Sequence, residues 1–183
     1  MRVIGLDPGL RVTGWGVIEV TDNRLRHLGD GVVCVSPDAP LAERLATLFD
    51  GISAVIDRFA PDEAAVEETF VNRNASSTLK LGHARGIVML APAKAGLPVA
   101  EYAATLVKKS IVGGGHAAKD QVGAMIRALL PGCVLEMPDA ADALAVAVCH
   151  AHHARSRDIV RASAKPATKS GAAPRRPFYY GAR

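Results

Sequence analysis

Three strand-like segments at the start of the chain are joined by connections too short to hold a helix. Residues 2–7 end at the turn pair Pro8-Gly9, residues 12–20 follow, and a third segment runs from the turn Thr21-Asp22-Asn23 to about Val35. Parallel neighbours need a crossover of a dozen or more residues, so these three strands must form an antiparallel meander. The rest of the chain has to add to a sheet that begins in this way.

The remaining residues alternate between helical and strand periods. In residues 40–59 the large apolar side chains recur three and four positions apart, which is the spacing of an amphipathic helix. Such alternation after a meander predicts an α/β protein with one mixed sheet and helices on its faces. The further strands expected are Ala64-Ala65-Val66 and Pro98 to Tyr102, and the further helices are Thr78 to about Ala95, 104–110, 117–130 and 139–153.

Certain residues predict irregularities in these elements. Gly14 and Gly16, inside a strand, indicate a bulge or another backbone passing close. Ser76 or Ser77 is expected to cap the helix that starts at Thr78, and Pro92 is expected to kink that helix or end it early. The segment 139–153 is apolar almost all round, so we expect this helix to pack against the sheet.

Length and composition indicate one ordinary domain. The chain has 183 residues, of which 49% are hydrophobic, enough for a substantial core. No apolar run reaches the roughly 18 residues of a membrane helix, so neither a spanning segment nor a signal peptide is expected. Cys34, Cys133 and Cys149 include no CxxC pair, which argues against a disulfide framework and a zinc knuckle and favours a reducing cytoplasm.

The positive charge is concentrated in the last residues. From Arg155 onward there are eight basic residues and one acid, Asp158, whereas the preceding 154 residues carry a net charge of −3. Beyond about Ser156 large apolar side chains are few, so we expect a folded domain over 1–155 and a flexible basic tail over 156–183. The tail could follow nucleic acid electrostatically or simply keep the protein in solution.

Four acids occupy positions where an apolar residue would be expected. Asp7 ends a strand that should be central, and Glu67 follows the short apolar segment Ala64-Ala65-Val66. Asp139 and Asp142, three residues apart, share one face at the start of a helix. An ionised carboxylate in such surroundings costs several kcal/mol or more unless it is paired or bound to a metal.

Each acid also has an ordinary structural interpretation. Asp7 before Pro-Gly could be a turn residue, Glu67 and Glu68 could form a solvated strand end, and Asp139 could cap a helix. Asp142 is harder to explain in this way because its neighbours are apolar. One oxygen-lined cation site would explain all four acids together, and such ligands select Mg²⁺ or Mn²⁺. Cations held in this way catalyse phosphoryl displacement.

A polar loop with an aromatic residue follows Glu67. Phe70 could be a core residue, or it could stack on or wedge between nucleic-acid bases beside a carboxylate site. The glycines at 113–115 before His116 resemble a phosphate-binding loop only weakly, and we expect a flexible helix connection there. Other candidates for DNA contact are polar or basic, and they could equally be solvated surface residues: Arg73, Asn74, Lys80, Arg85, Lys108 and Lys119.

Short motifs follow one another along the chain in a fixed order. They are Gly5-Leu6-Asp7-Pro8-Gly9, Thr13-Gly14-Trp15-Gly16, Val66-Glu67-Glu68-Thr69-Phe70, Asn74-Ala75-Ser76, Leu79 to Gly86, Glu101-Tyr102-Ala103 and Asp139 to Leu144. From Arg2 to about His153 the chain resembles the RuvC-type Holliday-junction resolvases of the ribonuclease H-like superfamily. The resemblance implies a five-stranded mixed sheet, meander first, with helices on both faces.

The resemblance also implies a site and an activity. The family's metal-binding and catalytic acids fall on Asp7, Glu67, Asp139 and Asp142, its junction-contacting aromatic falls on Phe70, and its basic residues near the scissile phosphate match Lys108 and Lys119. Two Mg²⁺ ions, with Mn²⁺ plausible, would support paired symmetric nicks in a four-way junction that leave 5′-phosphate and 3′-hydroxyl ends. A homodimer and a branch-migration motor are the implied partners, in recombination and repair. Departures from the family pattern are Pro92, Gly114, His116 and the basic tail.

Two other functions fit part of the pattern. A junction-binding protein without catalysis could use Phe70 and the basic residues alone, but the retained acids argue against it. An actin- or sugar-kinase-like ATPase also joins an Asp-containing strand to a Gly-rich hairpin, and residues 7–16 fit that motif loosely. Such ATPases need two lobes, for which 183 residues are too few.

Overall fold

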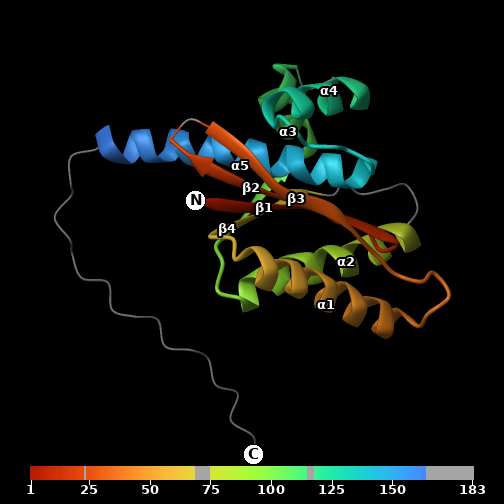
Figure 1. The fold of residues 1–183 in the computed structure, drawn as a ribbon. Coiled ribbons are helices and arrows are strands. Elements are labelled where there is room, and N and C mark those ends of the chain that lie inside the picture. The colour runs from red at the N-terminus through yellow and green to blue at the C-terminus, as the bar shows by residue number, and fades with distance from the viewer. Residues whose placement is uncertain (23, 69–74, 115–117, 164–183) are drawn as a thin grey trace, which may run out of the picture.

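A five-stranded mixed sheet forms the centre of the computed structural model, which describes residues 1–22, 24–68, 75–114 and 118–163. The strand order is β3-β2-β1-β4-β5 (Figure 1). The strands are β1 (Arg2–Asp7), β2 (Val12–Thr21), β3 (Arg24–Cys34), β4 (Glu63–Glu68) and β5 (Val99–Ala103). The helices are α1 (Leu41–Phe59), α2 (Ala75–Lys94), α3 (Ala104–Val112), α4 (Lys119–Leu129) and α5 (Pro138–Ser163).

The pairing of the strands changes from antiparallel to parallel at β1. Strands β1, β2 and β3 pair antiparallel, which confirms the meander, whereas β4 pairs parallel with β1, and β5 parallel with β4. The parallel pairs are possible because α1 and α2 supply the long crossovers that parallel neighbours require. The carboxyl ends of β1 and β4 therefore lie side by side at one edge of the sheet.

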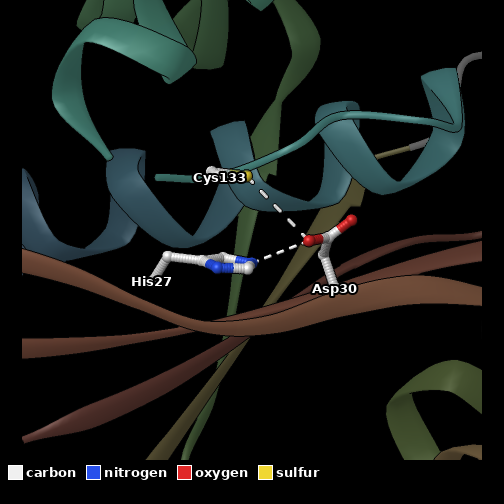
Figure 2. Close-up of side chains that lie close together, drawn as sticks. All are labelled: His27, Asp30 and Cys133. Atoms are coloured by element: carbon white, nitrogen blue, oxygen red, sulfur yellow. Dashed lines mark hydrogen bonds and ion pairs between the residues drawn. The ribbon is translucent and has the colours of Figure 1, made fainter. Parts of the chain in front are cut away.

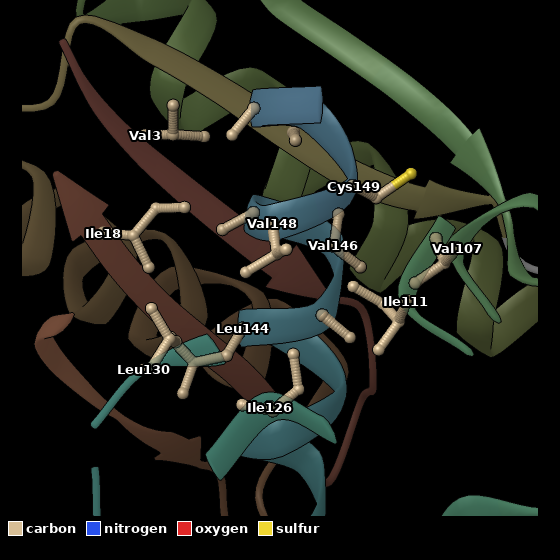
Figure 3. Packing of buried hydrophobic residues seen from close by; sticks show 14 of the residues in the cluster. Val3, Ile18, Val107, Ile111, Ile126, Leu130, Leu144, Val146, Val148 and Cys149 are labelled. Atoms are coloured by element: carbon tan, nitrogen blue, oxygen red, sulfur yellow. The ribbon is translucent and has the colours of Figure 1, made fainter. Parts of the chain in front are cut away.

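Helices cover both faces of the sheet and bury two separate apolar cores. On one face α1 and α2 cover the cluster that includes Leu6, Val17 and Ile52, and on the other α5 lies across the strands with α3 and α4 outside it (Figure 1). Figure 3 shows α5 from close by, with Val148 on the side of Ile18 of the sheet and Val146 on the side of Ile111 of α3. Since α5 lies between the sheet and two helices, residues 143–151 are buried on every side, as the almost entirely apolar sequence up to Val148 predicted.

Glycines allow α5 to lie directly on the strands. A Cβ at Gly5 would stand 2.1 Å from the Ala143 carbonyl oxygen, and one at Gly14 would stand 2.0 Å from that of Asp139. These distances are too short for any side chain, so the backbones meet here. The close approach predicted for Gly14 is confirmed, and the bulge in this part of the sheet lies elsewhere, in β3, where the pairing shifts opposite Val17 and Ile18.

Two helix boundaries differ from the sequence prediction. Helix α2 begins at Ala75, so Ser76 and Ser77 lie inside it and the prediction that one of them caps it was wrong. Capping propensity alone does not fix a boundary, because serine is also tolerated in a first helical turn. Helix α2 ends two residues after Pro92, near the predicted stop. Helix α5 continues to Ser163, ten residues beyond the predicted end, because neither Gly nor Pro occurs before Pro166.

None of the helices in the described residues combines the length and the apolar character needed to cross a membrane.

Candidate active site

The parallel register of β1 and β4 places two carboxylates next to each other. Leu6 lies opposite Val66, so Asp7 and Glu67, the next residue in each strand, stand side by side where the two strands end. The two side chains are hydrogen-bonded to each other. Neighbouring Glu68 is exposed whereas Glu67 is partly buried, so the alternation of the strand directs Glu67 toward Asp7 and Glu68 toward solvent.

The start of α5 brings the other two acids to the same edge. The antiparallel partner of Asp7 is Gly14, and the Asp139 backbone lies directly against that glycine. Asp142 follows one helical turn later, and Ala140 and Ala143 beside it are fully buried against the sheet. The charges of Asp139 and Asp142 both act on Asp7, so all four acids are within electrostatic reach of one carboxyl group.

This arrangement raises the pKa of Asp7 from 3.8 to about 8. Burial is the largest cause, followed by the negative charge of Glu67, the hydrogen bond to Glu67, and the charges of Asp142 and Asp139. Without a cation, Asp7 therefore keeps its proton at neutral pH. Four isolated surface acids would not produce such coupling, so the geometry favours the single-site interpretation over the four separate ones.

The donor set suits a hard divalent cation. All four candidate ligands are carboxylates, and oxygen ligands of this kind hold Mg²⁺ or Mn²⁺ rather than softer metals. A divalent charge between them would offset both the burial and the repulsion that keep Asp7 protonated. The residues that the sequence predicted as ligands, Asp7, Glu67, Asp139 and Asp142, thus fit the metal that it predicted.

An open groove begins at Asp139 and carries positive charge. Its lining includes Lys80, predicted as a DNA contact, and two arginines that the sequence analysis missed, Arg11 and Arg44. The Nη2 of Arg44 donates to the Leu10 carbonyl at 2.9 Å, while its buried Nε has no hydrogen-bond partner among the described residues. The position of Arg11, two residues after the Asp7-Pro8-Gly9 turn, is a signal that could have identified it, whereas Arg44 lies in a helix far along the chain.

The other predicted DNA contacts lie in different surroundings. Arg85 of α2 forms an ion pair with Glu101 of β5, so part of its charge is used within the protein. Lys108 is partly buried on α3, and Lys119 is the first residue of α4. Their contact with DNA remains a prediction. Phe70, Arg73, Asn74 and His116 lie outside the described residues.

Comparison with known proteins gives one consistent result. The model of the family described as "Crossover junction endodeoxyribonuclease RuvC" matches residues 3–150. A protein of that name from Paramagnetospirillum magneticum is 69% identical over 153 residues, which cover 84% of this chain and 92% of the relative. Another, from Rhodospirillum rubrum, is 68% identical over 153 residues, covering 84% of this chain and 90% of the relative.

A solved structure shares both sequence and fold with the chain. It is described as RuvC of T. thermophilus in complex with a Holliday-junction substrate, and it is 40% identical with a TM-score of 0.80. The match covers 86% of this chain and 96% of the other. The fold similarity extends to the yeast mitochondrial Holliday-junction resolvase Ydc2, at a TM-score of 0.61, 12% identity and coverage of 87% and 83%.

Proposed function

The chain belongs to the RuvC family of crossover junction endodeoxyribonucleases, and we propose that it resolves four-way (Holliday) DNA junctions by paired symmetric nicks. The observation that carries the chemistry is the coupling of one buried carboxyl, Asp7, to Glu67, Asp139 and Asp142 at the edge of the sheet. Bringing four acidic side chains together in partly buried surroundings costs free energy, and a bound cation would offset that cost. The coupled acids also argue against a junction-binding protein without catalysis.

Asp7, Glu67, Asp139 and Asp142 would hold two divalent ions, with Mg²⁺ as our first choice and Mn²⁺ as the alternative. Ions in such a site supply an activated water and neutralise the charge that develops on the phosphate and the leaving oxygen. The chain's own part is to position the ligands and lose one proton. Asp7 must give up its proton to become a ligand, and the contact between α5 and Gly14 fixes Asp139 relative to Asp7. The expected products have 5′-phosphate and 3′-hydroxyl ends.

The groove beside Asp139 is the path that we propose for a DNA strand approaching the acids. Arg11, Arg44 and Lys80 line it, and three positive side chains in one groove can contact successive phosphates. Phosphate contacts of this kind position the strand and carry no sequence information, so they are compatible with selection of the substrate by its branched shape.

The exposed face of α2 supports the homodimer. Leu79 and Leu90 are 63% and 46% exposed, and Gly82 and Gly86 have open space where a side chain would be. These four residues lie on one side of the helix, because they are spaced by three, four and four positions. A second copy packed on this apolar face would give two active sites for the two cut strands. We further propose that the protein acts together with a branch-migration motor and that it is located in the bacterial cytoplasm.

A cleavage experiment tests this function. The purified protein is incubated with a labelled four-way junction and with linear duplex of the same sequence, each with Mg²⁺, Mn²⁺ or a chelator. We expect paired nicks in the junction only, and only with metal. Asp7→Asn and Glu67→Gln should abolish cleavage but keep junction binding, whereas Glu68→Gln, the exposed neighbour, should cut normally. Cleavage by Asp7→Asn at the wild-type rate would contradict the assignment, and junction binding without cleavage by the wild type would favour the non-catalytic alternative.

A further inference from the structure

A histidine, a carboxylate and a thiol meet on the face of the sheet that α5 covers. His27 Nε2 lies 2.7 Å from Asp30 Oδ1, and the Cys133 thiol donates to the same oxygen at 3.9 Å. The three possible ligand atoms all lie within 4.8 Å of one another. Figure 2 shows the His27 ring and the Cys133 sulfur both directed at the Asp30 carboxylate. We propose that these three residues form a binding site for a borderline divalent cation of the Zn²⁺ type.

A bulge in β3 brings His27 and Asp30 together. In a regular strand, residues three positions apart point to opposite faces of the sheet. Here Val17 pairs with Gly29 and Ile18 with His27, so Leu28 is an extra residue that has no partner in the ladder. Asp30 pairs with Gly16 and His27 with Ile18, two positions of β2 that both contact the α5 side. The bulge thus turns both side chains toward the same point.

The third ligand comes from a distant part of the chain. Cys133 lies in the connector between α4, which ends at Leu129, and α5, which begins at Pro138. Cys133 is 8% exposed, and the side chains of His27 and Asp30 are 22% and 14% exposed. The cluster is therefore largely shielded from solvent, but an ion can still reach it. Arg127 acts against the burial and the Asp30 charge that raise the pKa of the thiol. A bound cation would remove the thiol proton outright.

The chemistry and the geometry both favour Zn²⁺. Imidazole, thiolate and carboxylate are its usual protein ligands, at about 2.0–2.3 Å from the ion, which places tetrahedral ligand atoms about 3.3–3.6 Å apart. The distance from His27 Nε2 to Asp30 Oδ1 is 2.7 Å and that from Cys133 Sγ to Asp30 Oδ1 is 3.9 Å, one below this range and one above it. Small side-chain rotations would therefore bring these ligand atoms to the separations that a tetrahedral ion requires. Water would occupy the fourth position. A hydrolytic Cys-His pair is a poorer interpretation, because Asp30 stands between the thiol and the imidazole.

Such an ion would tie the connector 130–137 to β3. That connector leads directly into Asp139 and Asp142 at the start of α5, so the site would be a structural clip next to the proposed catalytic acids. It uses different residues and softer ligands from those of the four-carboxylate site. The inference therefore does not depend on the proposed function.

Cobalt substitution gives a signal specific to this site. The full-length Cys34→Ser protein, which lacks the exposed thiol, is stripped with a chelator, kept reduced and titrated with Co²⁺. We expect a thiolate-to-cobalt charge-transfer band that saturates at one ion per chain and disappears when Zn²⁺ displaces Co²⁺. Carboxylates such as Asp7 and Glu67 cannot give this band, so the catalytic site does not interfere.

Variants then identify the ligands. Cys133→Ser should lose the band, and His27→Gln and Asp30→Asn should each weaken Zn²⁺ binding by at least about 100-fold, beyond the 10–100-fold typical of indirect ligand partners. Cys149→Ser, a control at another buried thiol, should keep the band if circular dichroism shows it folded. No charge-transfer band in the parent protein, or a band that survives Cys133→Ser, would overturn the proposal and leave a hydrogen-bonded cluster only. His27→Gln and Asp30→Asn decide the matter if Cys133→Ser does not fold.

Discussion

Replacing Asp7 by asparagine should stabilise the metal-free protein while it destroys activity. The folded state raises the pKa of Asp7 from 3.8 to about 8, so at pH 7 folding requires the carboxyl to take up a proton. At 1.36 kcal/mol for each pH unit between 3.8 and 7, that uptake costs about 4 kcal/mol. Asparagine is neutral at every pH and avoids this cost. Because Asp7 keeps some contact with solvent, which screens the charges, we expect a gain of about 2–4 kcal/mol.

The sign of the pH dependence distinguishes this explanation from others. A raised carboxyl pKa contributes stability that is fully present below the unfolded value of 3.8 and is lost as the pH rises to about 8. The wild type should therefore lose stability relative to Asp7→Asn between pH 4 and pH 8, with the difference only about 1–2 kcal/mol at pH 5. Above pH 8 the difference should become constant.

Urea unfolding in the presence of a chelator, at pH 5 and pH 7, measures the difference. Glu68→Gln serves as the matched control, since this exposed carboxylate lies beside the site and its replacement should change stability by less than about 0.5 kcal/mol. Saturating Mg²⁺ should then stabilise the wild type and leave Asp7→Asn nearly unchanged. A variant less stable than the wild type at pH 7, or a difference that is the same at both pH values, would refute the electrostatic reasoning.

Four further outcomes follow from the geometry. At limiting Mg²⁺ the cleavage rate should rise with pH up to about 8, because the metal must displace the Asp7 proton, and the rise should flatten at saturating Mg²⁺; a rate independent of pH at low Mg²⁺ would contradict this. Gly14→Ala should lower the free energy of unfolding in urea by about 3 kcal/mol and weaken cleavage, because the added Cβ meets the Asp139 carbonyl. The control Gly123→Ala, at an open helix position, should raise the free energy of unfolding by up to about 1 kcal/mol, and equal effects of the two variants would count against the close contact. Arg44→Ala should weaken junction binding and lower the slope of log affinity against log salt by about 1, which a binding titration at several salt concentrations would reveal; an unchanged slope would remove Arg44 from the DNA path. Leu90→Asp should shift the protein from dimer to monomer in analytical ultracentrifugation, with Asp57→Asn on α1 as control, and a dimer that survives would place the interface elsewhere.

The local chemistry of the chain was sufficient to predict most of the fold. The meander follows from short connections after residues 7 and 21, and the helix at 139–153 follows from its apolar residues, because both depend on neighbours in the sequence. The predicted end of that helix was wrong, since a helix without Gly or Pro can continue beyond its last buried turn. The four acids were predictable for a similar reason, because each is out of place within its own apolar segment.

Contacts between distant segments were decided by the tertiary structure alone. Arg44 reaches the groove beside Asp139 because α1 packs near the loop after β1, and nothing in its helix indicates this. His27 and Asp30 share a face only because a bulge shifts the register of β3, and Cys133 joins them from a connector about a hundred residues away. The raised pKa of Asp7 was likewise decided by the tertiary structure. It depends on burial and on the distances to three other charges, and those quantities exist only once the chain has folded.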